Sequence, residues 1–144
     1  NLVTGQTTEH ALDDANIEFP SVDSRIMGRH HRYFYNISMA NEPYLLFDGI
    51  VSFDQQTGAK EEHKFGPGRW GSEAPFAARD GSTGETDGYL VSFVNDEAEG
   101  RGEINVFDAS DVAAGPLARV LLPVRVPSGF HATWVRADQL QSRA

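Results

Sequence analysis

The chain has 144 residues, of which 40% are hydrophobic and 10% aromatic, and this composition is typical of one folded domain with a core. Its formal net charge of -9 and its scattered basic residues argue against binding to nucleic acid or to an anionic membrane surface. There is no cysteine, which excludes a disulfide scaffold, a thiolate metal ligand and a thiol nucleophile. A metal site in this chain must therefore use histidine and carboxylate side chains.

The sequence carries no predicted membrane or targeting segment. No apolar run approaches the roughly 20 residues of a membrane-spanning helix, and the first residues lack the basic and apolar regions of a signal peptide. We therefore expect no transmembrane segment. The lack of cysteine fits a reducing compartment, and we expect a cytoplasmic location. The chain begins without methionine, on a turn-like Thr4-Gly5, so we expect it to be a piece of a longer protein.

Short apolar or alternating runs, separated by glycine, asparagine and aspartate, predict β-strands along the chain. They are residues 32–38, 44–53, 88–94, 103–107 and 118–122. Only residues 11–16 and the last residues from Ala137 have a composition that could form a helix, and both segments are short. The sequence predicts an all-β chain.

The sequence also repeats itself in the same order at a nearly constant spacing. Residues 4–10 recur at 57–63, 18–20 at 73–75, 32–34 at 88–90, and 49–54 at 103–108. A repeat of about 50 residues in an all-β chain predicts the blades of a β-propeller. Because a propeller needs typically 4 to 8 blades to close, two units cannot form a ring.

We interpret residues 1–144 as a single β-propeller fragment of about two blades plus the inner strands of the next. The third unit is predicted to open at Ala118 and to run through Trp134. Residues 80–87, which are rich in Gly, Ser and Thr, are predicted to be a loop between strands rather than a domain boundary.

The repeat places Glu18 and Glu73 at equivalent positions of successive units. His131 reaches the same position of the third unit if about four residues are inserted near residues 113–116. Glu, Glu and His would then face one centre, which is a plausible metal site because a carboxylate that accepts the second N–H of a ligating imidazole fixes its orientation. A solvated Glu beside Pro and a core histidine are the structural alternatives, and periodicity alone leaves both open.

The motifs themselves are more specific. The hexapeptide Gly-Phe-His-Ala-Thr-Trp at residues 129–134 follows Leu-Pro-Val-Arg-Val-Pro at 122–127, and further motifs lie at 17–20, 72–76 and 87–90. Together, and in this order, they resemble the carotenoid cleavage oxygenase family, which includes bacterial apocarotenoid oxygenases and lignostilbene dioxygenases. The resemblance extends from Thr4 to Val135 and matches the C-terminal third of that family.

The resemblance implies the C-terminal blades of a seven-bladed β-propeller that holds Fe(II) on its axis with four histidines. Three of those histidines bond in turn to glutamates. By motif, His131 matches the last iron ligand, and Glu18 and Glu73 match two of the glutamates. The other ligands are expected in the N-terminal remainder of the same protein. Family members use dioxygen to split an alkene of an apolar polyene or stilbene into two carbonyl products, and the sequence does not choose between an apocarotenoid and a stilbene.

An apolar substrate also needs aromatic walls. Phe76 and Phe130, with Phe19, are candidates because they lie next to the predicted site residues, although packing in the core is the alternative for each. The other histidines are not expected to bind iron. His30 and His31 lie in a basic loop, and His10 and His63 are expected on the outer, solvated part of each blade.

Two other functions remain as alternatives. A hydrolase that uses Glu18 and Glu73 as paired carboxylates is conceivable, but it leaves His131 unexplained. A non-catalytic propeller that serves as a binding or scaffold module is the second alternative, and the presence of three further histidines upstream would distinguish the iron enzyme from it. Residues 54–58 are predicted to be a hairpin turn, because they lack the spaced carboxylates of a calcium loop.

Overall fold

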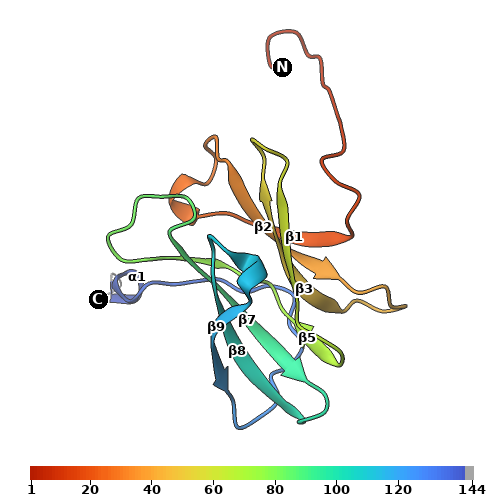
Figure 1. Cartoon of the computed structure of the whole chain (residues 1–144). Helices are drawn as coiled ribbons and strands as arrows, with labels where there is room; N and C mark the ends of the chain where they lie inside the picture. The colour runs from red at the N-terminus through yellow and green to blue at the C-terminus, as the bar shows by residue number, and fades with distance from the viewer. Residues whose placement is uncertain (142–144) are drawn as a thin grey trace.

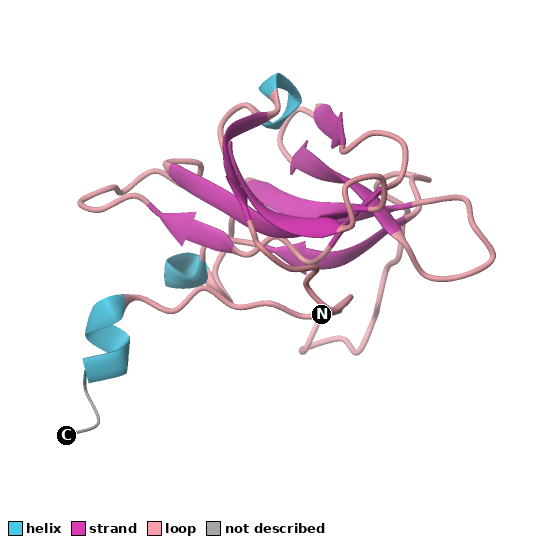
Figure 2. Cartoon of the chain, turned by 90° about the horizontal axis from the view of Figure 1, so that it is seen from below, coloured by secondary structure: helices cyan, strands magenta, loops and turns pink. Residues whose placement is uncertain are grey.

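The structure, a computed structural model, describes residues 1–141 and contains two antiparallel β-sheets packed against each other (Figures 1 and 2). The first sheet has four strands, each paired with the next in sequence. Its elements are β1 (Ile17–Ser21), the 3-10 helix η1 (Ser24–Ile26), β2 (Tyr33–Met39), β3 (Phe47–Asp54) and β4 (Lys60–Lys64). The residues before β1 run as a tail away from the sheets (Figure 1).

The second sheet has the same order, except that its first strand is divided in two. Both short strands pair with β7, so the order from that edge is β5 and β6, then β7, β8 and β9. Its elements are β5 (Arg69–Gly71), β6 (Phe76–Ala78), β7 (Gly88–Asp96), β8 (Arg101–Asp108), the 3-10 helix η2 (Val112–Ala114) and β9 (Pro116–Leu121). The short helix α1 (Ala137–Gln141) follows, and within residues 1–141 no helix is long and apolar enough to cross a bilayer.

The turn between β3 and β4 shows why the chain reverses where it does. Gly58 adopts a φ of 73°, which a residue with a side chain rarely tolerates, and its N–H donates to the Asp54 carbonyl at 2.8 Å. The Asp54 carboxylate accepts the N–H of Gln56 at 2.9 Å and a bidentate pair from Arg32 at 2.7 and 2.6 Å. The predicted hairpin is confirmed.

The core lies between the two sheets. Ile37 and Ile50 of the first sheet and Leu90 and Phe107 of the second are at most 1% exposed and belong to one apolar cluster. A buried hydrogen bond joins the sheets as well, because the Tyr35 hydroxyl donates to the Ala109 carbonyl at 2.9 Å. Burial raises the pKa of Tyr35 far above its ordinary value, so the phenol remains a neutral donor.

All five predicted strands are confirmed, but residues 118–121 do not open a third unit. Residues 118–121 belong to β9, which pairs with β8 as the outermost strand of the second sheet and therefore corresponds to β4 of the first. Residues 122–136 contain no strand. Hydrophobic runs predict that a strand forms, but its pairing partner depends on contacts that the run does not encode.

The two helical segments had different outcomes. Residues 11–16 are irregular, whereas α1 begins at Ala137 as expected; residues 142–144 lie outside the described residues.

The outer face of the second sheet repeats the inner face of the first. Val91, Phe93 and Ile104 hold the repeat positions of Tyr35, Ile37 and Ile50. In the first sheet these side chains are at most 1% exposed because the second sheet covers them, whereas Phe93 is 38% exposed. The outer face of the second sheet thus carries apolar residues at the repeat positions, but no other sheet within residues 1–141 covers it.

Candidate metal centre

The first strand of each sheet is interrupted where a glutamate lies. In the first sheet, the pairing of β1 with β2 shifts register between Glu18 and Ser21, and Phe19 adopts a left-handed φ of 53°. In the second, residues 72–75 separate β5 from β6. Pro20 and Pro75 fall at these interruptions and lack the N–H that would continue the ladder.

Ser92 closes the gap in the second sheet. Its hydroxyl donates to the Ser72 carbonyl at 2.9 Å, and the Ser72 N–H donates to the Phe93 carbonyl at 2.9 Å. The backbone is thereby satisfied on one side of Glu73, and the Glu73 carboxylate, 16% exposed, points toward the segment that follows β9. Hydrophobic periodicity predicts neither interruption. The proline two residues after each glutamate could have indicated them, because proline cannot donate a ladder hydrogen bond.

His131 lies beside Glu73 in the structure. The His131 Nδ1 lies 3.3 Å from the Glu73 Oε2, and the same oxygen accepts the backbone N–H of Ala132 at 2.8 Å. One carboxylate oxygen thus holds both the ring and the backbone beside it. Because Nδ1 is engaged, Nε2 is the nitrogen left to coordinate a metal, and the His131 side chain is 75% exposed.

Glu18 is not brought to His131. Its side chain is exposed on β1, and in the part of the chain that the structure describes its carboxylate has no hydrogen-bond or ion-pair partner. A solvated carboxylate at the position equivalent to Glu73 leaves an acceptor available for a histidine outside this chain.

The aromatic candidates separate into two environments. Phe130 is 53% exposed and sits beside His131, while the Phe19 ring makes an edge contact with the His131 imidazole at 4.7 Å between centroids. Phe76 is 5% exposed and stacks on Tyr35 in the core, although it also borders a hollow of about 200 Å³ beside Glu73. A packing role accounts for Phe76, and its role in substrate binding stays a prediction.

Sequence reasoning missed Phe47. This residue is 4% exposed at the start of β3 and contacts Phe19 and Phe130 at 5.3 and 6.4 Å between ring centroids. Phe47 is far along the sequence from Phe19 and Phe130, so nothing in the sequence indicated these contacts.

Among the described residues near Glu73, His131 could supply one ligand to a metal ion, and no complete set of ligands is present. Nowhere in residues 1–141 do three or more histidine, aspartate or glutamate side chains gather so as to hold a metal ion. A carboxylate that engages Nδ1 and leaves Nε2 free orients an imidazole for metal binding. The residues present therefore fit a single contribution to an iron site.

One of the remaining histidines departs from its predicted environment. His63 was expected to be solvated, but it lies on β4 between the sheets, 5.3 Å from the Phe107 ring, and its burial lowers its pKa, with a smaller effect from the charge of Arg119. A Cβ at Gly115 would lie 3.0 Å from the His63 Cε1, so the contact is close. His30 and His31 lie in the loop before β2, beside a polar hollow.

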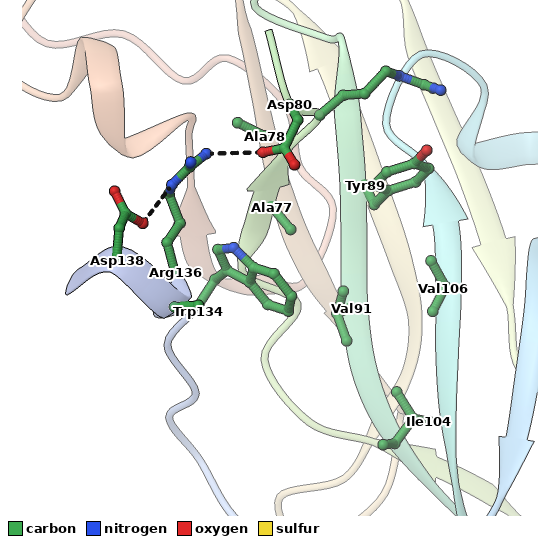
Figure 3. Close-up of a pocket in the computed structure, with 12 residues that line it drawn as sticks. Ala77, Ala78, Asp80, Tyr89, Val91, Ile104, Val106, Trp134, Arg136 and Asp138 are labelled. Carbon is green, nitrogen blue, oxygen red and sulfur yellow. Dashed lines mark hydrogen bonds and ion pairs between the residues drawn. The ribbon is translucent and has the colours of Figure 1, made fainter. Parts of the chain in front are cut away.

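A separate hollow lies on the outer face of the second sheet (Figure 3). It measures about 960 Å³ and is bordered by Val91, Ile104 and Val106 of the strands and by Trp134 of the C-terminal segment. Arg136 closes one side through contacts with Asp80 at 3.2 Å and Asp138 at 3.0 Å, as the dashed lines of Figure 3 show. This hollow belongs to the open sheet face and is distinct from the surroundings of His131.

Two repeated antiparallel sheets, which bring a histidine beside a partly buried carboxylate, define this chain as part of an all-β protein. Comparison with known families identifies it further. The family model described as RPE65, retinal pigment epithelial membrane protein, matches residues 1–136. The chain belongs to this family, the carotenoid cleavage oxygenases.

Similar proteins include plant enzymes. Carotenoid 9,10(9′,10′)-cleavage dioxygenase 1 of Pisum sativum is 37% identical over 159 residues, which cover 100% of this chain and 29% of that protein. The 9-cis-epoxycarotenoid dioxygenase NCED1 of Oryza sativa is 36% identical over 150 residues, 99% of this chain and 23% of that protein. The chain thus spans less than a third of the length of these relatives.

Solved structures agree in fold. The lignostilbene dioxygenase of Pseudomonas brassicacearum is 30% identical with a TM-score of 0.78, over 86% of this chain and 28% of that one. The cobalt-substituted apocarotenoid oxygenase of Synechocystis is 27% identical with a TM-score of 0.79, over 87% of this chain and 26% of that one.

Proposed function

We propose that this chain is the C-terminal part of a non-haem iron(II) dioxygenase that cleaves a carbon-carbon double bond of an apocarotenoid or a stilbene. Both oxygen atoms of dioxygen enter the products, so that one alkene gives two carbonyl compounds. The observation that carries the proposal is the contact of His131 with Glu73, because it occupies Nδ1 with a carboxylate and leaves Nε2 free to bind a metal.

Each site residue has a distinct role in this proposal. His131 supplies one of four histidine ligands, and Glu73 holds its tautomer and spreads negative charge toward the metal without occupying a coordination position. Glu18 does the same for a histidine that lies upstream of this chain. When iron is bound, it supplies the site at which dioxygen is activated.

The environment of His131 suits an apolar substrate. The Phe19 ring makes an edge contact with the imidazole, and the half-exposed Phe130 ring, which contacts Phe19, presents apolar surface. The similar proteins named above act on carotenoids in one case and on lignostilbene in another, which supports the reaction class and leaves the choice of alkene open.

Iron content tests the ligand assignment. The full-length protein is expected to hold about one iron per chain, and His131→Ala is expected to lose most of it, because one of the protein ligands is gone. His30→Ala, which removes an exposed imidazole from a loop, is the matched control and is expected to keep the iron. Stoichiometric iron in His131→Ala would sink the assignment, and a wild-type protein that takes up no iron would favour a non-catalytic binding module.

A product assay tests the reaction. The full-length protein is incubated with a resveratrol-like stilbene and with an apocarotenal under ¹⁸O₂, and the products are read by mass spectrometry. We expect paired carbonyl products from one of the two substrates, each labelled. Turnover of neither substrate by the iron-loaded protein would contradict the proposed reaction.

A further inference from the structure

The segment that carries His131 is attached to the two sheets in different ways. Toward the second sheet it uses hydrogen bonds: Leu122 N–H donates to the Gly102 carbonyl at 2.9 Å, Val126 N–H to the Asn95 Oδ1 at 3.2 Å, and Ala132 N–H to Glu73 at 2.8 Å. Toward the first sheet, the contacts that residues 130 and 131 make are between rings. In Figure 1 this segment, in blue, leaves β9 and crosses to the first sheet before it ends in α1.

One hydrogen bond cannot fix an imidazole. The contact between His131 Nδ1 and Glu73 sets the position of one ring atom, but the ring can still swing about that contact, and with 75% of the side chain exposed little else restrains it. A metal ligand needs a defined direction for Nε2, because coordination geometry tolerates small errors only. A second contact on the ring is therefore required.

Phe19 provides that contact. Its ring lies 4.7 Å from the His131 ring, with the planes at 61°, an edge-to-face arrangement that aromatic rings prefer. Phe19 itself keeps a left-handed φ of 53°, a conformation that a residue with a side chain rarely adopts and that persists only where surrounding packing enforces it.

The enforcing packing comes from Phe47 and Phe130. Both rings lie edge-on to Phe19, at 5.3 and 6.4 Å between centroids, and they contact each other at 6.4 Å. Phe47 is 4% exposed in the core, so it anchors the group to the rigid start of β3. We call Phe19, Phe47 and Phe130 the aromatic clamp.

We propose that Phe19, held by the aromatic clamp, is a positioning residue that aims the His131 Nε2 at the metal. Glu73 fixes the imidazole from the second sheet and Phe19 fixes it from the first, so the two sheets together define one direction. This inference rests on the proposed function, because it takes His131 to be a metal ligand.

The test compares cobalt(II) binding by full-length variants, with the d–d absorption spectrum and resistance to a chelator as readouts. Phe19→Leu removes the ring and is expected to weaken cobalt binding about tenfold, the lower end of the loss on removing a partner of a metal-bound histidine, and to change the spectrum. Phe19→Tyr keeps the ring and is expected to restore both. The melting temperature of each metal-free protein is measured in parallel.

Phe34→Leu is the matched control. Phe34 is a partly buried phenylalanine of the same sheet that stacks on Phe53 at 4.8 Å, so its loss costs similar packing away from His131. We expect a lower melting temperature with an unchanged cobalt spectrum. Equal weakening of cobalt binding in Phe34→Leu, or wild-type binding in Phe19→Leu, overturns the inference.

Two further variants keep the test decisive. Phe130→Leu, at a half-exposed position that does not endanger folding, frees one side of Phe19 and is expected to weaken cobalt binding less than Phe19→Leu. If Phe19→Leu does not fold, unchanged binding in Phe130→Leu overturns the inference. His131→Ala separates the two proposals. If His131→Ala binds cobalt like the wild type, the proposed function fails. If His131→Ala binds cobalt weakly while Phe19→Leu binds it like the wild type, only the positioning role of Phe19 fails.

Discussion

At the scale of single residues, the Glu73 carboxylate does more than any other group to define the site. The same Oε2 atom accepts from the Ala132 backbone and contacts the His131 ring, so one carboxylate ties both the imidazole and the backbone beside it to the second sheet. Glu18 has the same place in the repeat but an open environment. The difference between the two glutamates follows from what each one meets in space, since their sequence contexts are alike.

Replacing Glu73 with Gln keeps an oxygen acceptor but removes the charge that makes His131 a better ligand. We expect Glu73→Gln to reduce metal affinity or activity of the full-length protein by about 10- to 100-fold, with little change in melting temperature. Glu9→Gln, at an exposed position of the N-terminal tail, is the control. Metal titration followed by activity measurement checks this, and an unaltered affinity in Glu73→Gln would be evidence against its role.

His63 makes stability depend on pH. Its burial against Phe107 lowers its pKa below the ordinary 6.5, so the unfolded chain takes up the proton more readily than the folded one. Its contribution is complete above pH 6.5 and is lost as the pH falls from there through the lower pKa of the folded state. Urea unfolding of wild type and His63→Asn between pH 7.5 and 5.5 measures this, and we expect the wild type to lose more stability across the range. Parallel pH profiles would contradict the assignment.

At the scale of elements, the first strand of the second sheet is divided into β5 and β6, and Glu73 lies in the gap between them. The hydroxyl of Ser92 takes the place of a ladder bond there, while β6 returns the chain to β7 at the Phe76–Leu90 pair. Glu73 therefore lies at an interruption of the strand, and the pairing of β5 and of β6 with β7 holds the chain in place on either side. Bulges of this kind recur beside functional sites.

Gly88 allows β6 to lie close to β7. A Cβ at this position would come within 2.5 Å of the Phe76 Cζ and 2.6 Å of the Ala77 carbonyl, so Gly88→Ala must displace β6. We expect it to lower the free energy of unfolding by about 1 to 3 kcal/mol, the usual effect of overpacking. Denaturant unfolding checks this, with Gly84→Ala as control because its nearest neighbour lies at an ordinary 3.5 Å. Equal stability of the two variants would contradict the crowding.

At the scale of the whole molecule, the open face of the second sheet indicates what is absent from this chain. Its apolar residues, including Phe93, Ile104 and Val120, match positions that the first sheet buries against the second. We propose that another sheet of the same kind, from elsewhere in the protein, covers it and continues the ring of blades. The hollow of Figure 3 would then lie at a contact between sheets.

The isolated chain is therefore expected to self-associate through this face. Phe93→Glu combined with Val120→Lys places charges on it and is expected to shift the chain toward monomer in sedimentation velocity. Leu12→Lys removes an even more exposed apolar side chain from the tail and is expected to leave the association unchanged. A wild-type chain that is monomeric at high concentration would show that the open face alone does not drive association.

Much of this organisation was predictable because it depends on local pattern. Alternating hydrophobicity gives the strands, and the recurrence of residues 18–20 at 73–75 places the two glutamates in register. The assignment of residues 118–121 failed because a short apolar strand pairs equally well with the preceding sheet or with a new one. The prediction of a solvated His63 failed for a related reason, since a position in a hairpin does not specify which face of the strand another sheet covers.

The sequence by itself determined the all-β class, the repeat, the family resemblance and the candidate residues Glu18, Glu73 and His131, because spacing and motif are properties of the chain alone. Only the tertiary structure decided that Glu73 rather than Glu18 meets His131, and that Phe47 belongs beside them. These relations join residues tens of positions apart through the packing of two sheets. Such contacts depend on where each strand finds its partner, which no local pattern specifies.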